Sequence, residues 1–112
     1  MYVKEATTLL SIDDFQKRCK EKNIAITKHA RIRFSERGID VIDIQNAIKT
    51  GDIIQQYEND TPFPGCLISG INEENRPIHI VASADGEYIY VITAYYPDED
   101  GWEADMKTRK RH

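Results

Sequence analysis

The chain has 112 residues, of which 40% are hydrophobic and 30% charged, and its formal net charge is −4. This length suits one ordinary domain over residues 1–112, and the apolar share is too high for an intrinsically disordered chain. No apolar run approaches the roughly 20 residues of a membrane-spanning helix, and the first residues lack the basic and apolar regions of a signal peptide. We therefore expect a cytoplasmic protein.

Basic residues are concentrated in two places of an otherwise acidic chain. Residues 27–37 carry four basic residues against one glutamate, and residues 106–112 form a basic tail with four lysines and arginines. Such a distribution suits a discrete anion site better than a surface that coats nucleic acid along its whole length. The two cysteines, Cys19 and Cys66, match no metal or redox motif and are expected to be buried free thiols.

Three helices are predicted in the first half of the chain. Each begins at a residue that can cap a helix with its side chain, and each carries apolar residues at helical spacing. The second ends at Gly38, the usual left-handed stop, and Gly51 stops the third. We take residues 1–25 as an added N-terminal helix and residues 26–102 as the core. The expected helical segments, caps included, are Ser11–Asn23, Thr27–Gly38 and Asp40–Gly51.

The second half of the chain consists of short strand-like runs separated by segments rich in Gly, Pro, Asn and Asp. Connections this short favour an antiparallel meander, because parallel strands need long crossovers. Helices followed by strands predict an α+β domain, with three N-terminal helices packed on a four-stranded antiparallel sheet. The expected strands are Ile53–Tyr57, Cys66–Ile71, Ile78–Ser83 and Tyr88–Tyr95.

A polar stripe on the second predicted helix lies beside its apolar residues rather than opposite them. Charges of a solvated face would point away from the core, and a guanidinium group matches the oxygens of phosphate or carboxylate in two-point contacts. The stripe therefore predicts an anion site. The alternative is that the arginine stems cover the edge of the core while the histidine packs. The stripe consists of His29, Arg33, Glu36 and Arg37.

A second candidate group is on the last two predicted strands, and its geometry depends on the hairpin between them. A two-residue turn pairs His79 with Ile92 and places Thr93 on the opposite face. A three-residue loop with a bulged glycine pairs His79 with Val91 and unites His79, Thr93 and Tyr95 on one face. The sequence leaves both registers open.

Three segments of the chain form an ordered pattern. They are His29-Ala30-Arg31-x-Arg33-x-x-x-Arg37-Gly38-Ile39, then Arg76-Pro77-x-His79-x-Val81, then Ile92-Thr93-x-Tyr95-x-Pro97-Asp98 with Trp102 beyond. With this pattern the chain resembles a widespread bacterial family of domains of unknown function, similar to the small RelE- and BrnT-like toxins. Ala94 and Tyr96 depart from the usual pattern. The resemblance implies a RelE/BrnT-like fold and a ribonuclease toxin that needs no metal and is paired with an antitoxin.

The expected reaction is attack of the ribose 2′-oxygen on the adjacent phosphate of RNA. It needs an acid, a base and a cation, and histidine is the side chain that titrates near neutral pH. No metal or other cofactor is expected, because the sequence carries no ligand-spaced cysteine pair and no glycine-rich phosphate loop. The expected roles are acid and base for His29 and His79, phosphate binding for Arg33 and Arg37, hydroxyl donation for Thr93 and Tyr95, and orientation for Glu36.

The competing interpretation is a binding module that performs no chemistry. In that case the arginine stripe pairs with the carboxylates of a partner protein or with another anionic ligand. An inhibitor of a toxin would also present acidic side chains to this stripe, since complementary charge speeds encounter and fixes register. The expected partners are thus RNA and an acidic, antitoxin-like protein, with a homodimer as the alternative association.

Overall fold

The computed structural model describes residues 10–58, 64–85, 87–98 and 100–109. These residues form three α-helices, one short 3-10 helix and five strands. One strand lies among the helices, and the other four follow them. In that part of the chain, no helix is both long and apolar enough to cross a membrane. The elements are α1 (Ile12–Lys17), η2 (Glu21–Asn23), β1 (Ile24–Ile26), α2 (Lys28–Glu36), α3 (Val41–Thr50), β2 (Asp52–Tyr57), β3 (Gly65–Ile71), β4 (Pro77–Ala84) and β5 (Ile89–Tyr95).

The caps of α2 and α3 are the ones that the sequence predicts. The Thr27 hydroxyl accepts from the backbone N–H of Ala30, and Asp40 forms a reciprocal capping box with Asp43. The first helix is shorter than expected. It ends at Lys17, and the chain continues through η2 into an unpredicted strand, β1, so residues 24 and 25 belong to the sheet.

The prediction of a four-stranded antiparallel sheet is wrong. The sheet has five strands in the order β1-β5-β4-β3-β2, and β1 pairs with β5 in parallel, with Ile24 opposite Ile89. The remaining neighbours are antiparallel, as expected from their short connections. The sequence does not reveal β1 because three residues are too few to show alternation and their partner strand lies at the other end of the chain.

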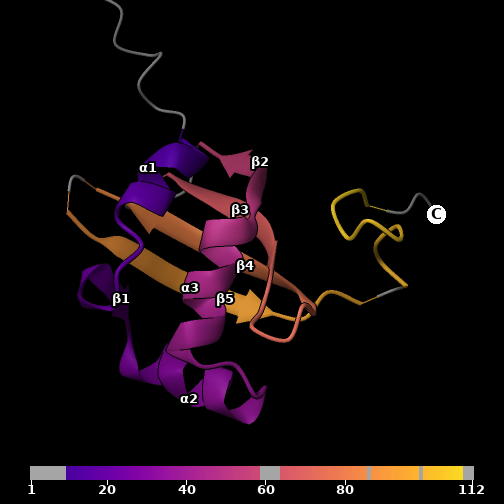
Figure 1. Cartoon of the computed structure of the whole chain (residues 1–112), viewed down its shortest axis with the longest axis horizontal. Coiled ribbons are helices and arrows are strands. Elements are labelled where there is room, and N and C mark those ends of the chain that lie inside the picture. Colours follow the sequence, from indigo (N-terminus) through magenta and orange to yellow (C-terminus); the bar gives the residue numbers. More distant parts are fainter. Residues whose placement is uncertain (1–9, 59–63, 86, 99, 110–112) are drawn as a thin grey trace, which may run out of the picture.

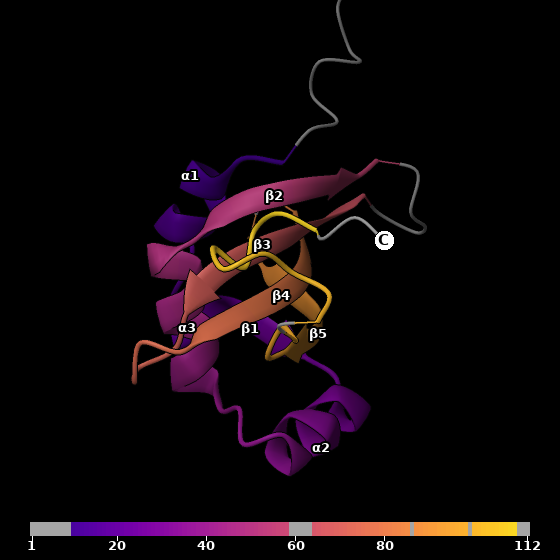
Figure 2. The same ribbon diagram turned by 90° about the vertical axis from the view of Figure 1, so that its right-hand side faces the viewer.

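The main core lies between one face of the sheet and the helices. Figures 1 and 2 show α1 and α3 together over the sheet, with α2 lower, beyond β1 and β5. Alternate residues of β4, Ile78, Ile80 and Ala82, point into this core. Both cysteines are buried free thiols, as predicted.

The register between β4 and β5 differs from both predicted alternatives. Ala84 pairs with Ile89 and His79 pairs with Tyr95, so the connection is longer than either turn considered from the sequence. Ile92 is the extra residue of a β-bulge, because Val81 pairs with Thr93 whereas Ala82 pairs with Val91. Despite the different register, His79, Thr93 and Tyr95 share the face that points away from the main core.

The C-terminal segment 100–109 covers part of that second face. Trp102 is buried, and a single bridge pairs it with Arg109, whose guanidinium lies 4.6 Å from the centre of the indole ring. Lys107 forms an ion pair with Asp52 at 2.9 Å. Lys107 and Arg109 of the basic tail are exposed and make these contacts, and residues 110–112 lie outside the described residues.

Candidate functional site

A pocket between α2 and β5 brings together most of the predicted anion-binding residues. Its volume is about 180 Å³. His29, Arg33 and Arg37 line it from the helix, and Ile92 and Thr93 line it from the strand. We call it the α2–β5 pocket. Residues that are distant in the sequence thus meet at one surface.

The position of α2 follows from its two ends. Thr27 follows directly after β1 and caps the helix, so the helix begins where the parallel strand stops. At the other end, Gly38 adopts φ +72°, and Ile39 N–H donates to the Phe34 carbonyl at 2.8 Å. This is a Schellman stop, in which a left-handed glycine satisfies the last carbonyls and returns an apolar residue to the core. Both ends of the pocket-lining helix are thereby fixed.

Arg37 connects the helix to the strand. Its Nη1 donates to the carbonyl of Ala94 at 2.8 Å and to the Thr93 hydroxyl at 3.4 Å. A guanidinium group has five N–H donors, so these two bonds leave most of its donors for a ligand. The backbone carbonyl fixes the direction of the arginine, which reduces the side-chain entropy that binding would remove.

The β-bulge shapes the strand side of the pocket. Ile92 is 54% exposed, which is unusual for a large aliphatic side chain within a sheet. The extra residue turns the strand locally, so that Ile92 and Thr93 both line the pocket although successive residues normally point to opposite faces. Sequence reasoning assigned no role to Ile92, because nothing in the sequence marks the bulge.

The α2–β5 pocket is positively charged. Its lining includes two arginines and one histidine but no carboxylate. Glu36 lies on the same helix and is exposed, and it is not among the lining residues. In the described part of the chain, no ion pair joins Glu36 to His29 or Arg33. No contact therefore supports the orienting role that the sequence predicts for Glu36. The arrangement can bind an anion, whose oxygens accept from the arginine N–H groups, and place an imidazole beside it.

His79 and Tyr95 form a separate, buried cluster. His79 is fully buried, with Tyr95 Oη 3.3 Å from its Nδ1 and the Met106 carbonyl 2.6 Å from its Nε2. A carbonyl oxygen only accepts, so Nε2 carries the proton and Nδ1 accepts from the Tyr95 hydroxyl. The ring of Trp102 packs against the imidazole in an edge-on contact at 4.5 Å between centroids. The predicted pair of histidines is therefore divided between an exposed pocket and a covered cluster.

The sequence analysis did not predict that the C-terminal segment covers His79. The Met106 carbonyl accepts from His79 and from the Ser69 hydroxyl, at 3.4 Å, so one backbone group ties the segment to two strands. Met106 has a φ of 58°, a left-handed conformation that is uncommon outside glycine. The single tryptophan of the chain was a usable signal for a covered face, whereas the left-handed Met106 was not.

Burial lowers the pKa of His79 below its ordinary value of 6.5; the Met106 hydrogen bond opposes this shift, and the positive charge of Arg109 adds to it. The unfolded chain therefore binds a proton at a pH where the folded chain does not. We expect the free energy of unfolding to fall as the pH drops below about 6.5, and the loss to level off below the folded pKa. Urea unfolding at several pH values measures this. His79→Gln should remove that part of the pH dependence, and an unchanged profile in the variant would contradict the assignment.

The described residues contain no group of three or more histidine, cysteine, aspartate or glutamate side chains that could hold a metal ion. A family model, described as Domain of unknown function (DUF4258), matches residues 26–96. This span starts at the last residue of β1 and includes both sides of the α2–β5 pocket, and His79 with Tyr95; it ends before Trp102. Neither the curated proteins nor the solved structures include a significant match to the chain. The predicted family of unknown function is thus confirmed, and nothing in the comparisons supports the finer relation to RelE- and BrnT-like toxins.

Proposed function

The chain belongs to the DUF4258 family, and we propose that it is a metal-independent ribonuclease whose phosphate site is the α2–β5 pocket. One observation carries the proposal: His29, Arg33 and Arg37 line a single exposed pocket that no carboxylate enters. The pocket thereby supplies the base and the cations that cleavage by a ribose 2′-oxygen requires, and open access to solvent supplies the acid. The resemblance to RelE- and BrnT-like toxins supports the same reaction class.

The pocket residues suggest a division of roles. Arg33 and Arg37 hold the phosphate, and their charge stabilises the negative charge that builds on its oxygens. His29 takes the proton of the 2′-hydroxyl as the 2′-oxygen bonds to phosphorus. The bond from phosphorus to the 5′-oxygen then breaks, and solvent protonates the leaving oxygen because the pocket is open. Thr93 accepts from Arg37 and keeps that guanidinium at the strand edge.

The cluster of His79 and Tyr95 contributes in this proposal only when the C-terminal segment is displaced. Both ring nitrogens of His79 are bonded within the protein. As the second acid or base, His79 would first have to lose the Met106 carbonyl and the cover of Trp102. Its catalytic role and that of Tyr95 stay predictions.

The proposal is tested by cleavage of a labelled single-stranded RNA with the purified full chain. We expect cleavage to persist in EDTA and to yield 2′,3′-cyclic phosphate ends. Arg33→Ala should weaken both RNA binding and cleavage, by about tenfold in affinity if one charge-assisted contact is lost. Lys28→Ala, on the same helix but outside the pocket, serves as the matched control for lost charge. Loss of all activity in EDTA, or equal effects of the two variants, would contradict the proposal.

A second candidate is supported by the burial of His79. Because only one imidazole lines the exposed pocket, the same arginines suit a binding module that pairs with the carboxylates of an acidic partner protein. An antitoxin-like inhibitor of the ribonuclease would use the same contacts. Expression of the chain alone in a bacterial host separates the two: a growth defect that Arg33→Ala relieves favours the toxin, and absence of any RNA cleavage favours the module.

A further inference from the structure

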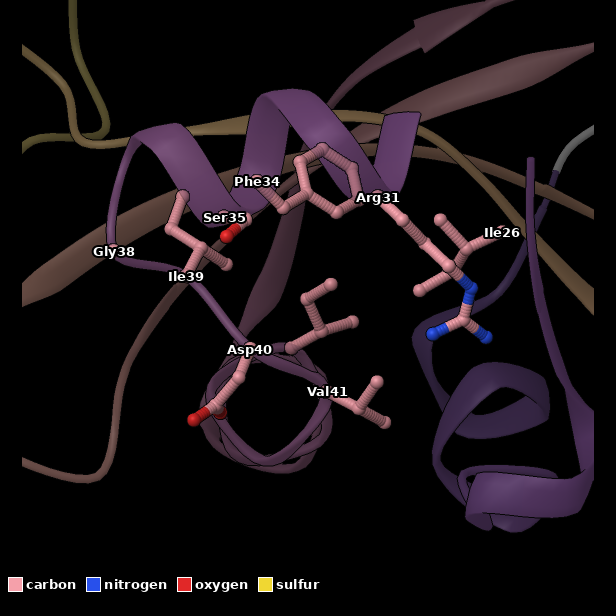
Figure 3. Close-up of a pocket in the computed structure, with 9 residues that line it drawn as sticks. Ile26, Arg31, Phe34, Ser35, Gly38, Ile39, Asp40 and Val41 are labelled. Atoms are coloured by element: carbon pink, nitrogen blue, oxygen red, sulfur yellow. The ribbon is translucent and has the colours of Figure 1, made fainter. Parts of the chain in front are cut away.

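A second pocket lies on the other side of α2, between this helix and α3. Figure 3 shows its lining residues around an open centre. Its volume is about 400 Å³, which lies within the range of small-molecule sites, whereas the α2–β5 pocket is smaller than that range. We call it the α2–α3 pocket. Its apolar lining residues are Ile26, Phe34, Ile39, Val41 and Ile44, of which Phe34, Ile39 and Ile44 are buried.

One end of the α2–α3 pocket carries an uncommitted positive charge. Arg31 lies three residues before Phe34 on the same helix, and its side chain extends past Ile26 (Figure 3). Within the described residues, no hydrogen bond or ion pair occupies the Arg31 guanidinium. A free cation at the rim of an apolar pocket is suited to a ligand that has an apolar body and one anionic end.

The acidic residue at the pocket does not offset this charge. Asp40 lies at the opposite side of the pocket, and its carboxylate accepts from the backbone N–H of Asp43 as part of the capping box. In Figure 3 the Asp40 carboxylate points away from Arg31. The Ser35 hydroxyl is the other polar side-chain group of the lining. The apolar centre of the pocket thus lies between the hydrogen-bonded carboxylate of Asp40 and the free guanidinium of Arg31.

We propose that the α2–α3 pocket binds a medium-chain alkyl carboxylate. The alkyl chain lies against Ile26 and Val41, the half-buried apolar residues of the lining, where each methylene that they cover is removed from water. The carboxylate pairs with the Arg31 guanidinium, whose planar fork matches its two oxygens. This site is separate from the phosphate site of the proposed ribonuclease, since the two pockets share only Phe34 among their lining residues. It stands whether or not the chain cleaves RNA.

The molecule contains an internal control for apolar binding alone. A further pocket at the edge formed by β1 and β5 has a volume of about 480 Å³ and includes Tyr90, Val91 and Ile92, but no charged residue. A ligand that binds through its alkyl chain alone would occupy this edge pocket as readily as the α2–α3 pocket. A ligand chosen for its carboxylate would prefer the α2–α3 pocket.

The test uses the full chain labelled at the methyl groups of isoleucine and valine and observed by NMR. Octanoate is the probe, and octanol, which lacks the charge, is the matched control ligand. We expect octanoate to shift the methyl signals of Ile39, Val41 and Ile44 in a saturable way and to leave Ile92 unchanged. Octanol should bind at the same place about fivefold more weakly, the factor that one exposed ion pair supplies.

Two arginine variants on the same helix complete the experiment. Arg31→Gln should weaken octanoate about fivefold and make it equal to octanol, while Arg33→Gln, which lines the other pocket, should leave octanoate binding unchanged. RNA binding should be weakened by Arg33→Gln and unchanged in Arg31→Gln. Since Arg31 and Arg33 are both exposed, neither variant should unfold the chain. Val41→Phe, which fills the pocket, should abolish the binding of both ligands.

Three outcomes would overturn the proposal. They are equal affinity of the wild type for octanoate and octanol, shifts at Ile92 as large as those at Ile39, and unchanged octanoate binding in Arg31→Gln. Because the octanoate readout does not involve RNA, its failure is separate from failure of the ribonuclease proposal. Octanoate binding without any RNA cleavage would contradict only the ribonuclease proposal.

Discussion

Replacing Gly70 with alanine is expected to lower the free energy of unfolding by about 3 kcal/mol or more. Gly70 lies on β3 where α3 crosses it, and a Cβ atom there would be 2.0 Å from the carbonyl oxygen of Ala47. Backbone atoms cannot turn aside as the end of a side chain can, so helix and strand would have to separate. That loss is a large part of the roughly 5–15 kcal/mol that stabilises a domain. Urea unfolding followed by circular dichroism measures it.

Gly38→Ala is the matched control, because it adds the same methyl group at a place with free space. No atom lies within 4 Å of a Cβ at Gly38, but φ there is +72°. The free energy of unfolding of this variant should fall only by the cost of placing alanine in the left-handed conformation, about 1 kcal/mol. If Gly70→Ala destabilised the chain no more than Gly38→Ala, the close approach of α3 to β3 would be refuted.

Replacing His29 with alanine is expected to reduce the rate of RNA cleavage by about 10²–10⁴-fold, the usual contribution of a general base. RNA affinity should change little, because Arg33 and Arg37 still hold the phosphate. Single-turnover cleavage at saturating protein, together with a separate binding titration, distinguishes rate from affinity. The measurement distinguishes His29 from the arginines, whose removal weakens binding as well.

Two further variants make that result decisive. Lys28→Ala, beside His29 but outside the α2–β5 pocket, should cleave at the wild-type rate. His79→Gln should also cleave at the wild-type rate if His29 works alone from the open pocket. A loss in His79→Gln with none in His29→Ala would assign the base to the covered cluster, and it would require the C-terminal segment to open during the reaction.

Local sequence signals predicted the helices and the antiparallel strands better than the sheet as a whole. The caps at Thr27 and Asp40 depend on neighbouring residues, and the structure confirms both. The parallel pairing of β1 and the bulge at Ile92 depend on residues far apart in the chain. Sequence periodicity contains no information of that kind, which is why the sheet was predicted with one strand too few.

The candidate site shows the same division. The stripe of His29, Arg33 and Arg37 could be recognised because helical geometry alone places these residues on one side. The Met106 carbonyl that binds His79 could not be recognised, since it comes from a C-terminal segment without regular structure. The structure accordingly keeps the arginine stripe together and separates His79 from it.

The parallel pairing of β1 with β5 has a consequence for the order of folding. The strands β2 to β5 follow one another as hairpins, whereas β1 reaches β5 only after the whole chain between Ile26 and Ile89 has closed into a loop. Closing a longer loop costs more chain entropy, and non-local contacts form slowly. Because α2 follows β1 directly, we expect this helix to dock on β5 in the same late step. Detachment of β1 would then release α2 as well, so that a partly unfolded molecule would keep its hairpins and lose the α2–β5 pocket first.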